Sequence, residues 1–183
     1  ATVGVLDRES ITRNHAHAVK AEARPCALEG NPVFDDLAQI LTALEGDRRV
    51  LAVNHVIDAS GAPLGLGVGT WRGSLERCLD VARQRFVRQV EHPVDVLVAS
   101  VEGVLARTLY QADKGLKNNE AVVKDGGDLI LCAKLGGGVG PDRFLQFLAD
   151  GPGDDYVLGD HKAIRWRALE ARGVRIRIAS PDL

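Results

Sequence analysis

Apolar residues follow two different patterns before and after residue 90. Before it, one stripe recurs at helical spacing and predicts a helix over residues 32–44: Phe34, Leu37, Ile40, Leu41 and Leu44. Asn31 and Pro32 precede this stripe and are typical of an N-cap and a first helical position. An earlier helix is expected from Ser10 to about Ala23, with Asp7 or Ser10 as its cap.

Residues 48–71 predict a hairpin. A strand-like run ends in the turn sequence "DASGAP", and a glycine-spaced second strand follows. The next helix runs from about Ser74 to Val90 and stops before Pro93, because proline disfavours helix in the preceding residue. We expect this helix to connect two domains, residues 1–90 and residues 91–183.

After Pro93, strands and helices alternate. The continuous apolar run "VDVLVASV" is typical of a buried parallel strand. Later segments continue the alternation: helical "TLYQADKGLKNNEAVV", strand-like "GGDLILCAKL", helical "PDRFLQFLAD" and "GDHKAIRWRALEARG", and strand-like "VRIRIAS". This order predicts an α/β fold in which residues 91–183 form a parallel sheet with right-handed crossovers, Rossmann-like in the broad sense.

Polar side chains follow one face of the predicted helix after residue 108. Gln111, Lys114 and Asn118 are spaced by three and four residues, so a helix places them on the same side. One interpretation is a solvated face, and the other is a row of polar groups at a ligand.

Two stretches are rich in glycine and suggest phosphate binding: Gly65–Gly69 and Gly136–Gly140. Neither matches the dinucleotide-binding motif G-x-G-x-x-G, because Thr70 and Pro141 stand at the position of its last glycine. The second stretch lies between a strand and a helix. Its amides could meet an anion, or the glycines could serve a tight loop.

The histidines leave several interpretations open. His15 and His17 are two residues apart, so a helix points them to different sides, and His15 could be one ligand of a metal completed from elsewhere. His161 and Lys162 open a helix after "LGD"; they either belong to its cap region or face a cleft.

Composition narrows the class of protein. The 183 residues are 45% hydrophobic and 26% charged, with a net charge of -2, so nucleic acid and membrane are not expected partners. No apolar run approaches the roughly 20 residues of a membrane span, and we expect a cytoplasmic protein. Three distant cysteines, Cys26, Cys78 and Cys132, indicate neither disulfides nor a thiolate metal site. The absence of methionine and the opening "ATVGVLD" lead us to expect a fragment or a processed chain.

Three segments, in this order, resemble the lactate racemase family, whose enzymes use a nickel-pincer nucleotide. The first is "VGVLDRESITRNH", the second is "LEGNPVFDDL", and the third is "LYQADKGL" followed by "VVKDGGDLILCAKLGGGVG". The resemblance covers nearly the whole chain. It implies that the chain is the C-terminal portion of such an enzyme: the remainder of an N-terminal α/β cofactor-binding domain (1–90) and a Rossmann-like C-terminal domain (91–183).

The resemblance also implies roles for individual residues. His15 would ligate nickel, and Asn14 beside it would contact the cofactor. Gln111 and Lys114 would be catalytic residues that contact the substrate. Further substrate contacts would come from Tyr110, His161 and Lys162.

The implied reaction is racemisation or epimerisation of a small 2-hydroxy acid by reversible hydride transfer through a keto acid. The cofactor-tethering lysine is expected upstream of Ala1, so the N-terminal part of the same protein would be a partner and this chain alone would be inactive. "EGVLAR" and "GDHKA" depart from the family pattern and favour a hydroxy acid other than lactate. Two alternatives stay open: a non-catalytic Rossmann-like carboxylate-binding module, and an enzyme of another class that uses His161 and Lys162.

Overall fold

The computed structural model describes residues 6–24, 27–151 and 156–182. Contacts divide the chain into two compact units: Ala1–Ala21 with Val90–Leu183, here the sheet unit, and Glu22–Gln89, here the hairpin unit. This division also has a boundary beside residue 90. It differs from the expected one because the first 21 residues group with the sheet unit and not with residues 22–89.

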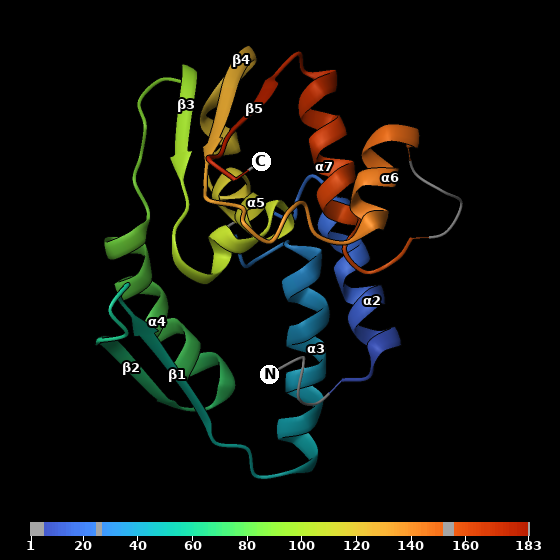
Figure 1. Cartoon of the computed structure of the whole chain (residues 1–183). Coiled ribbons are helices and arrows are strands. Elements are labelled where there is room, and N and C mark those ends of the chain that lie inside the picture. The colour runs from blue at the N-terminus through green and yellow to red at the C-terminus, as the bar shows by residue number, and fades with distance from the viewer. Residues whose placement is uncertain (1–5, 25–26, 152–155, 183) are drawn as a thin grey trace. The chain divides into compact units, whose positions relative to one another are not determined.

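The sheet unit contains α2 (Arg8–Ala16), β3 (Val94–Ser100), α5 (Leu109–Lys117), β4 (Val123–Cys132), α6 (Asp142–Asp150), α7 (Asp160–Ala171) and β5 (Arg175–Ala179). Its short 3-10 turns are η1 (His17–Val19), η2 (Gly103–Arg107) and η3 (Glu120–Val122). The three strands are parallel in the order β3-β4-β5, which confirms the predicted α/β alternation (Figure 1).

One face of this sheet carries the core. Leu97, Leu129 and Ile176 are in register on neighbouring strands, and Leu129 is fully buried. The core around them comes from the helices: Ala112, Leu116, Phe144, Ala163, Trp166 and Leu169. On the opposite face of β3, Val96 and Val98 are 53% and 60% exposed. The helices of the described chain therefore bury one side of the sheet.

The glycine-rich loop after β4 is bonded to the start of α5. Gly137 N–H donates to the Arg107 carbonyl at 2.7 Å, and Tyr110 N–H donates to the Val139 carbonyl at 2.9 Å. A Cβ at Gly137 would lie 2.8 Å from that same Arg107 oxygen, so this close approach requires glycine. These bonds favour the tight-loop interpretation of Gly136–Gly140 over the anion site.

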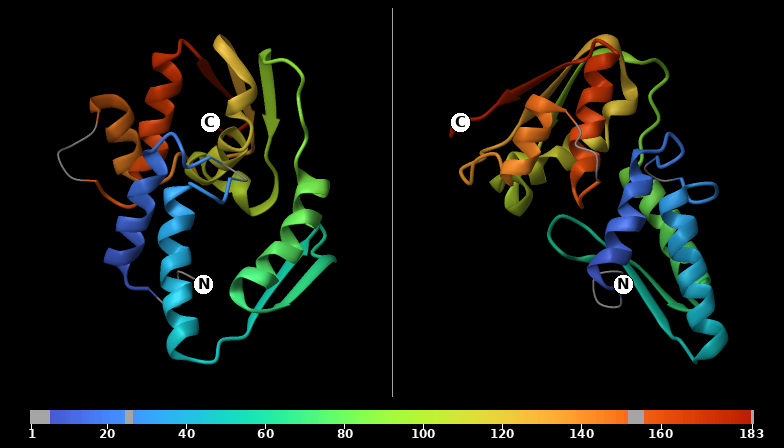
Figure 2. Two further views of the ribbon diagram at one scale, coloured as in Figure 1. Left: turned by 180° about the vertical axis from the view of Figure 1, so that it is seen from behind. Right: turned by 90° about the vertical axis from the view of Figure 1, so that its right-hand side faces the viewer.

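The hairpin unit contains α3 (Pro32–Asp47), β1 (Ala52–Ile57), β2 (Pro63–Gly69) and α4 (Trp71–Phe86). β1 and β2 are antiparallel, so the predicted hairpin is confirmed (Figure 2). A Cβ at Gly67 would overlap the Ser74 carbonyl oxygen, and Asn54 Nδ2 donates to Ser74 Oγ at 2.7 Å. The glycines of β2 thus serve close packing of α4 on the hairpin.

Several helix boundaries differ from those predicted. α4 ends at Phe86 and not at Val90, and α5 ends at Lys117 although its helical segment was expected to reach Val123. α2 ends at Ala16 and passes into the turn η1. Val19, the one large apolar residue between Ala16 and Ala23, is 44% exposed, so a longer helix would gain little burial from it. α4 begins at Trp71, because Thr70 Oγ1 accepts from Gly73 N–H at 3.1 Å and caps it.

Cys26 lies outside the described residues, Cys78 is buried and Cys132 is partly buried. Within the described ranges, the chain forms no helix long and apolar enough to span a bilayer.

Candidate active site

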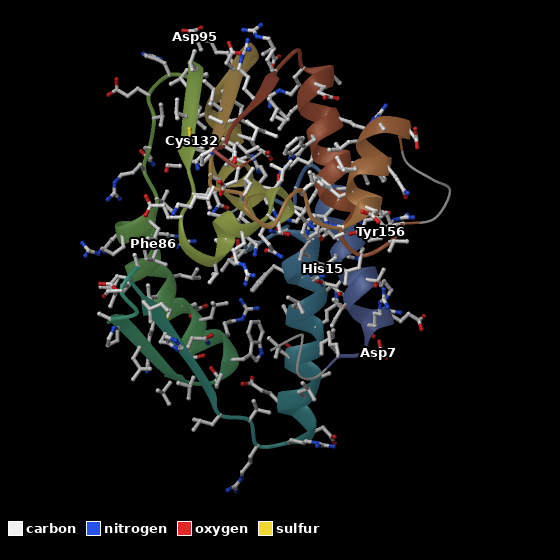
Figure 3. All side chains as sticks on the ribbon, in the orientation of Figure 1. Asp7, His15, Phe86, Asp95, Cys132 and Tyr156 are labelled. Carbon is white, nitrogen blue, oxygen red and sulfur yellow. The ribbon has the colours of Figure 1, made fainter. Side chains whose placement is uncertain are left out.

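α2 presents His15, the expected metal ligand, near its end (Figure 3). Asp7 Oδ1 accepts from Ser10 N–H at 2.7 Å, which confirms Asp7 as the cap. His15 Nδ1 lies 2.9 Å from the Ile11 carbonyl oxygen. Because a carbonyl can only accept, Nδ1 carries the hydrogen, and the neutral ring keeps its lone pair on Nε2. Such an Nε2 is suited to bind a metal. Asn14 beside it is 1% exposed.

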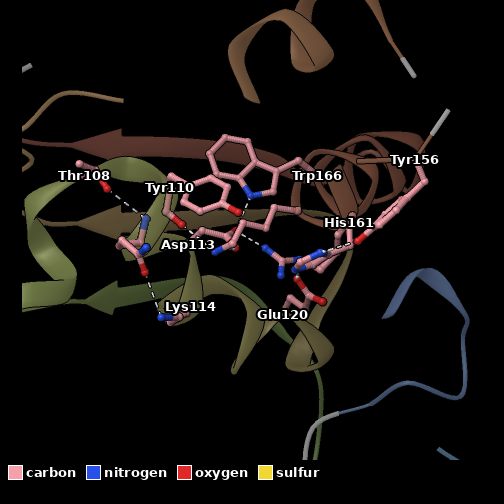
Figure 4. Close-up of polar contacts among 11 residues, drawn as sticks. Thr108, Tyr110, Asp113, Lys114, Glu120, Tyr156, His161 and Trp166 are labelled. Atoms are coloured by element: carbon pink, nitrogen blue, oxygen red, sulfur yellow. Dashed lines mark hydrogen bonds and ion pairs between the residues drawn. The ribbon is translucent and has the colours of Figure 1, made fainter. Parts of the chain in front are cut away.

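α7 brings a second imidazole to His15. The ring centroids of His15 and His161 are 6.0 Å apart. Tyr156 Oη lies 3.1 Å from His161 Nδ1 (Figure 4). Burial lowers the pKa of His161 to about 4, and the charge of Lys117 acts in the same direction, so this ring is neutral at pH 7. Two imidazoles from distant parts of the chain therefore lie close together.

α5 places the expected polar pair on one face. Lys114 Nζ donates to Gln111 Oε1 at 3.0 Å, which confirms that these side chains are neighbours. Thr108 caps the helix by accepting from Gln111 N–H, whereas Asn118 lies after the last turn. Among the described residues, no hydrogen bond, ion pair or ring contact joins this pair to His15 or His161.

Lys162 lies inside the protein, at 7% exposure, and not in an open cap region. Its ammonium donates to the Tyr110 carbonyl at 2.7 Å and to Asp113 Oδ2 at 3.3 Å. Burial lowers the pKa of Lys162, and the Asp113 carboxylate opposes this shift. A contact of Lys162 with substrate stays a prediction, since both of these partners are internal.

Asp113 is a buried residue that the sequence analysis missed. It is fully buried and lies among the apolar residues of α5, with Leu109, Ala112 and Leu116. The spacing of these four positions is that of a core-facing helical stripe, so an acidic residue within it was a usable signal. Tyr156 had no such signal, because it lies outside any periodic segment.

Glu120 is a second missed acid. Its Oε2 lies 2.8 Å from Arg165 Nε, but the two are not aligned as a hydrogen bond, and neither atom has another partner in the described part of the chain. Burial raises the pKa of Glu120 to about 7, which outweighs the attraction of Arg165. Glu120 therefore titrates near neutral pH.

Glutamine at position 120 is expected to flatten the pH dependence of stability. Since the folded pKa lies above the ordinary value, the folded chain binds more protons than the unfolded chain between pH 4.5 and about 7, and stability falls as pH rises through that window. Between pH 5 and pH 8, the unfolding free energy of the wild type should fall by about 1–3 kcal/mol more than that of Glu120→Gln. Urea unfolding at both pH values measures this. The exposed Glu170→Gln on α7 is the control, and equal pH slopes for all three proteins would contradict the prediction.

The described residues contain no group of three or more His, Cys, Asp or Glu side chains that could hold a metal. A metal at this site would take His15 Nε2 as one ligand and further donors from a cofactor or another segment. The histidine fits such a shared role, because its second nitrogen is fixed by the Ile11 carbonyl.

A separate cavity of about 810 Å³ lies at the carboxyl ends of the strands. Ser100, Cys132 and Ala179, which are in register, line it together with Arg107 and Lys134. In open α/β sheets, ligands bind at this edge.

The parallel sheet and its helices define a Rossmann-like α/β protein. Two histidines of its helices lie close together, and one of them, His15, is a candidate metal ligand. Residues 89–167 match the family of the lactate racemase C-terminal domain. A lactate racemase from Thermoanaerobacterium thermosaccharolyticum is 28% identical over 151 residues, which are 80% of this chain and 34% of that protein. The comparisons support the lactate racemase family, and within it the C-terminal portion.

The fold agrees with this family. The lactate racemase apoprotein structure from the same organism superposes with a TM-score of 0.76 and 23% identity, and the match covers 93% of this chain and 43% of that chain. The chain thus spans about a third of the length of the curated relative.

Proposed function

We propose that this chain is part of a nickel-pincer-dependent racemase or epimerase of 2-hydroxy acids, which works by reversible hydride transfer through a keto acid and requires the N-terminal part of the same protein. The observation that carries the proposal is the tautomer of His15, which leaves a lone pair on Nε2. Its ring lies near the neutral His161, which belongs to the segment that matches the family.

When bound, the nickel-pincer nucleotide supplies the acceptor and donor for the hydride of the substrate α-carbon. His15 Nε2 would hold its metal. Lys114 has two ammonium hydrogens left beyond its bond to Gln111, and these suit a substrate carboxylate. The Gln111 carbonyl oxygen accepts from Lys114, which leaves the Gln111 amide hydrogens as donors for a hydroxyl or keto oxygen of the substrate.

Replacing Lys114 with methionine tests this assignment in the longer protein matured with cofactor. The KM for a 2-hydroxy acid should rise about 10- to 100-fold, since a hydrogen bond between charged groups is lost. Conversion of one stereoisomer into the other, followed by chiral chromatography, measures turnover. Lys124→Met is the matched control, because Lys124 forms an exposed ion pair with Asp95. An unchanged KM in Lys114→Met would remove this lysine from the site.

The cavity lined by Arg107 and Lys134 favours one alternative, a carboxylate-binding module without catalysis. That alternative predicts carboxylate binding without nickel and without interconversion of 2-hydroxy acid stereoisomers. Interconversion by the wild type would exclude it.

A further inference from the structure

Asp113 joins α5 to α7 through a buried carboxylate. Three donors on α7 converge on it: Lys162 Nζ at 3.3 Å, Trp166 Nε1 at 2.6 Å, and Arg165 Nη2. The carboxylate is fully buried, and Figure 4 shows Trp166 and Tyr110 on the same side of it. One acidic residue on α5 therefore contacts three side chains from two successive turns of α7.

The same lysine returns to the start of α5. Lys162 Nζ donates to the Tyr110 carbonyl and lies 4.4 Å from the centre of the Tyr110 ring. The Tyr110 ring packs edge-on against Phe144, with centroids 5.6 Å apart, and Phe144 packs in the same way against Trp166. Tyr110, Asp113, Phe144, Lys162 and Trp166 thus form a closed ring of contacts, here the Asp113 frame.

Two glycines with positive φ hold Tyr110 in this frame. A Cβ at Gly140 (φ +116°) would lie 2.6 Å from the Tyr110 Cβ, and one at Gly159 (φ +106°) would overlap the Tyr110 hydroxyl. A side chain at either glycine would collide with Tyr110. Glycine at both positions therefore leaves space for the Tyr110 side chain between the loop before α6 and the residue before α7.

The position of α5 depends on such contacts. The helix has nine residues, and isolated helices of this length are marginal in water. Buried ion pairs seldom add stability over well-packed apolar residues of the same size, but their geometry is specific. Charge in this part of the core is therefore better explained by a need for one fixed arrangement of α5 than by a need for stability.

We propose that Asp113 is a positioning residue that, through Lys162 and Trp166, fixes the first turns of α5 and so the placement of Gln111 and Lys114. The frame itself stands on the contacts above, whereas its consequence for a substrate rests on the proposed function.

Trp166→Phe tests the frame in the 183-residue chain, because it removes one hydrogen bond to Asp113 and keeps an aromatic ring. Amides of residues 109–114 should exchange with solvent about 10- to 100-fold faster, the range for loss of a hydrogen bond to a charged group. Amides of β3 and β4 should change little. Trp71→Phe in the hairpin unit is the matched control, since both tryptophans are 6% exposed and only Trp166 contacts Asp113.

Equal acceleration in α5 and in the strands would show a loss of global stability alone and would overturn the proposal. Unchanged exchange in residues 109–114 would overturn it as well.

A second measurement separates this inference from the proposed function. In the longer protein matured with cofactor, Trp166→Phe should lower kcat/KM about tenfold or more, mainly through KM, while Trp71→Phe should not. If the wild type does not interconvert the stereoisomers of 2-hydroxy acids, the proposed function fails, and the amide exchange result still decides whether the frame exists. Wild-type activity with an unchanged KM in Trp166→Phe would overturn the positioning role alone.

Discussion

Alanine at His15 is expected to remove most of the nickel from the longer protein matured with cofactor. The reason is the tautomer: the Ile11 carbonyl takes the Nδ1 hydrogen, so Nε2 offers a lone pair without a proton to displace. Loss of one protein ligand, when the described residues offer no cluster to replace it, should lower nickel retention at least about tenfold. Metal analysis after desalting measures the nickel-to-protein ratio.

His17→Ala is the matched control. His17 lies two residues further along, in η1, and takes no part in the ring contact with His161. Its nickel content should equal that of the wild type. Retention of nickel by His15→Ala, or equal losses in both variants, would remove His15 from the metal site.

Asparagine at Asp113 is expected to lower the unfolding free energy of the sheet unit by about 3–5 kcal/mol, the usual result of removing one partner from a buried charge cluster. The substitution keeps the shape of the side chain but removes the charge that balances Lys162 and Arg165 inside the protein. That loss is a large share of the 5–15 kcal/mol that holds a typical domain folded.

Urea unfolding in a Trp71→Phe background measures this effect, because Trp166 then reports on the sheet unit alone. Asp125→Asn provides the control: Asp125 is exposed and pairs with Arg172 at 2.7 Å, so its removal should cost less than about 1 kcal/mol. A variant chain already unfolded without urea is the extreme form of the expected result. Similar midpoints for the two variants would contradict it.

Local sequence signals predicted most of the elements. Asp7 and Asn31 cap their helices as expected, because capping needs one side chain and an amide two or three residues away. The hairpin and the parallel sheet followed from the change of hydrophobic period near residue 90. The end of α2 was missed, since it depends on whether later residues find a surface to pack against.

The candidate site was predicted less completely. Spacing alone indicated that Gln111 and Lys114 share a face, and their side chains are in contact. It could not indicate that Lys162 turns inward to Asp113, because the two residues are 49 positions apart and meet only when α7 packs on α5. The approach of His15 to His161 has the same origin.

By itself, the sequence determined the caps, the periodicities and the order of elements, because these depend on interactions within a few residues. The tertiary structure alone decided which polar side chains are buried and which partners they meet. Such contacts join segments far apart in the chain, and the free energy of a charge depends on the solvent that folding removes. For this protein, Asp113, Glu120 and His161 acquired their properties only at that second stage.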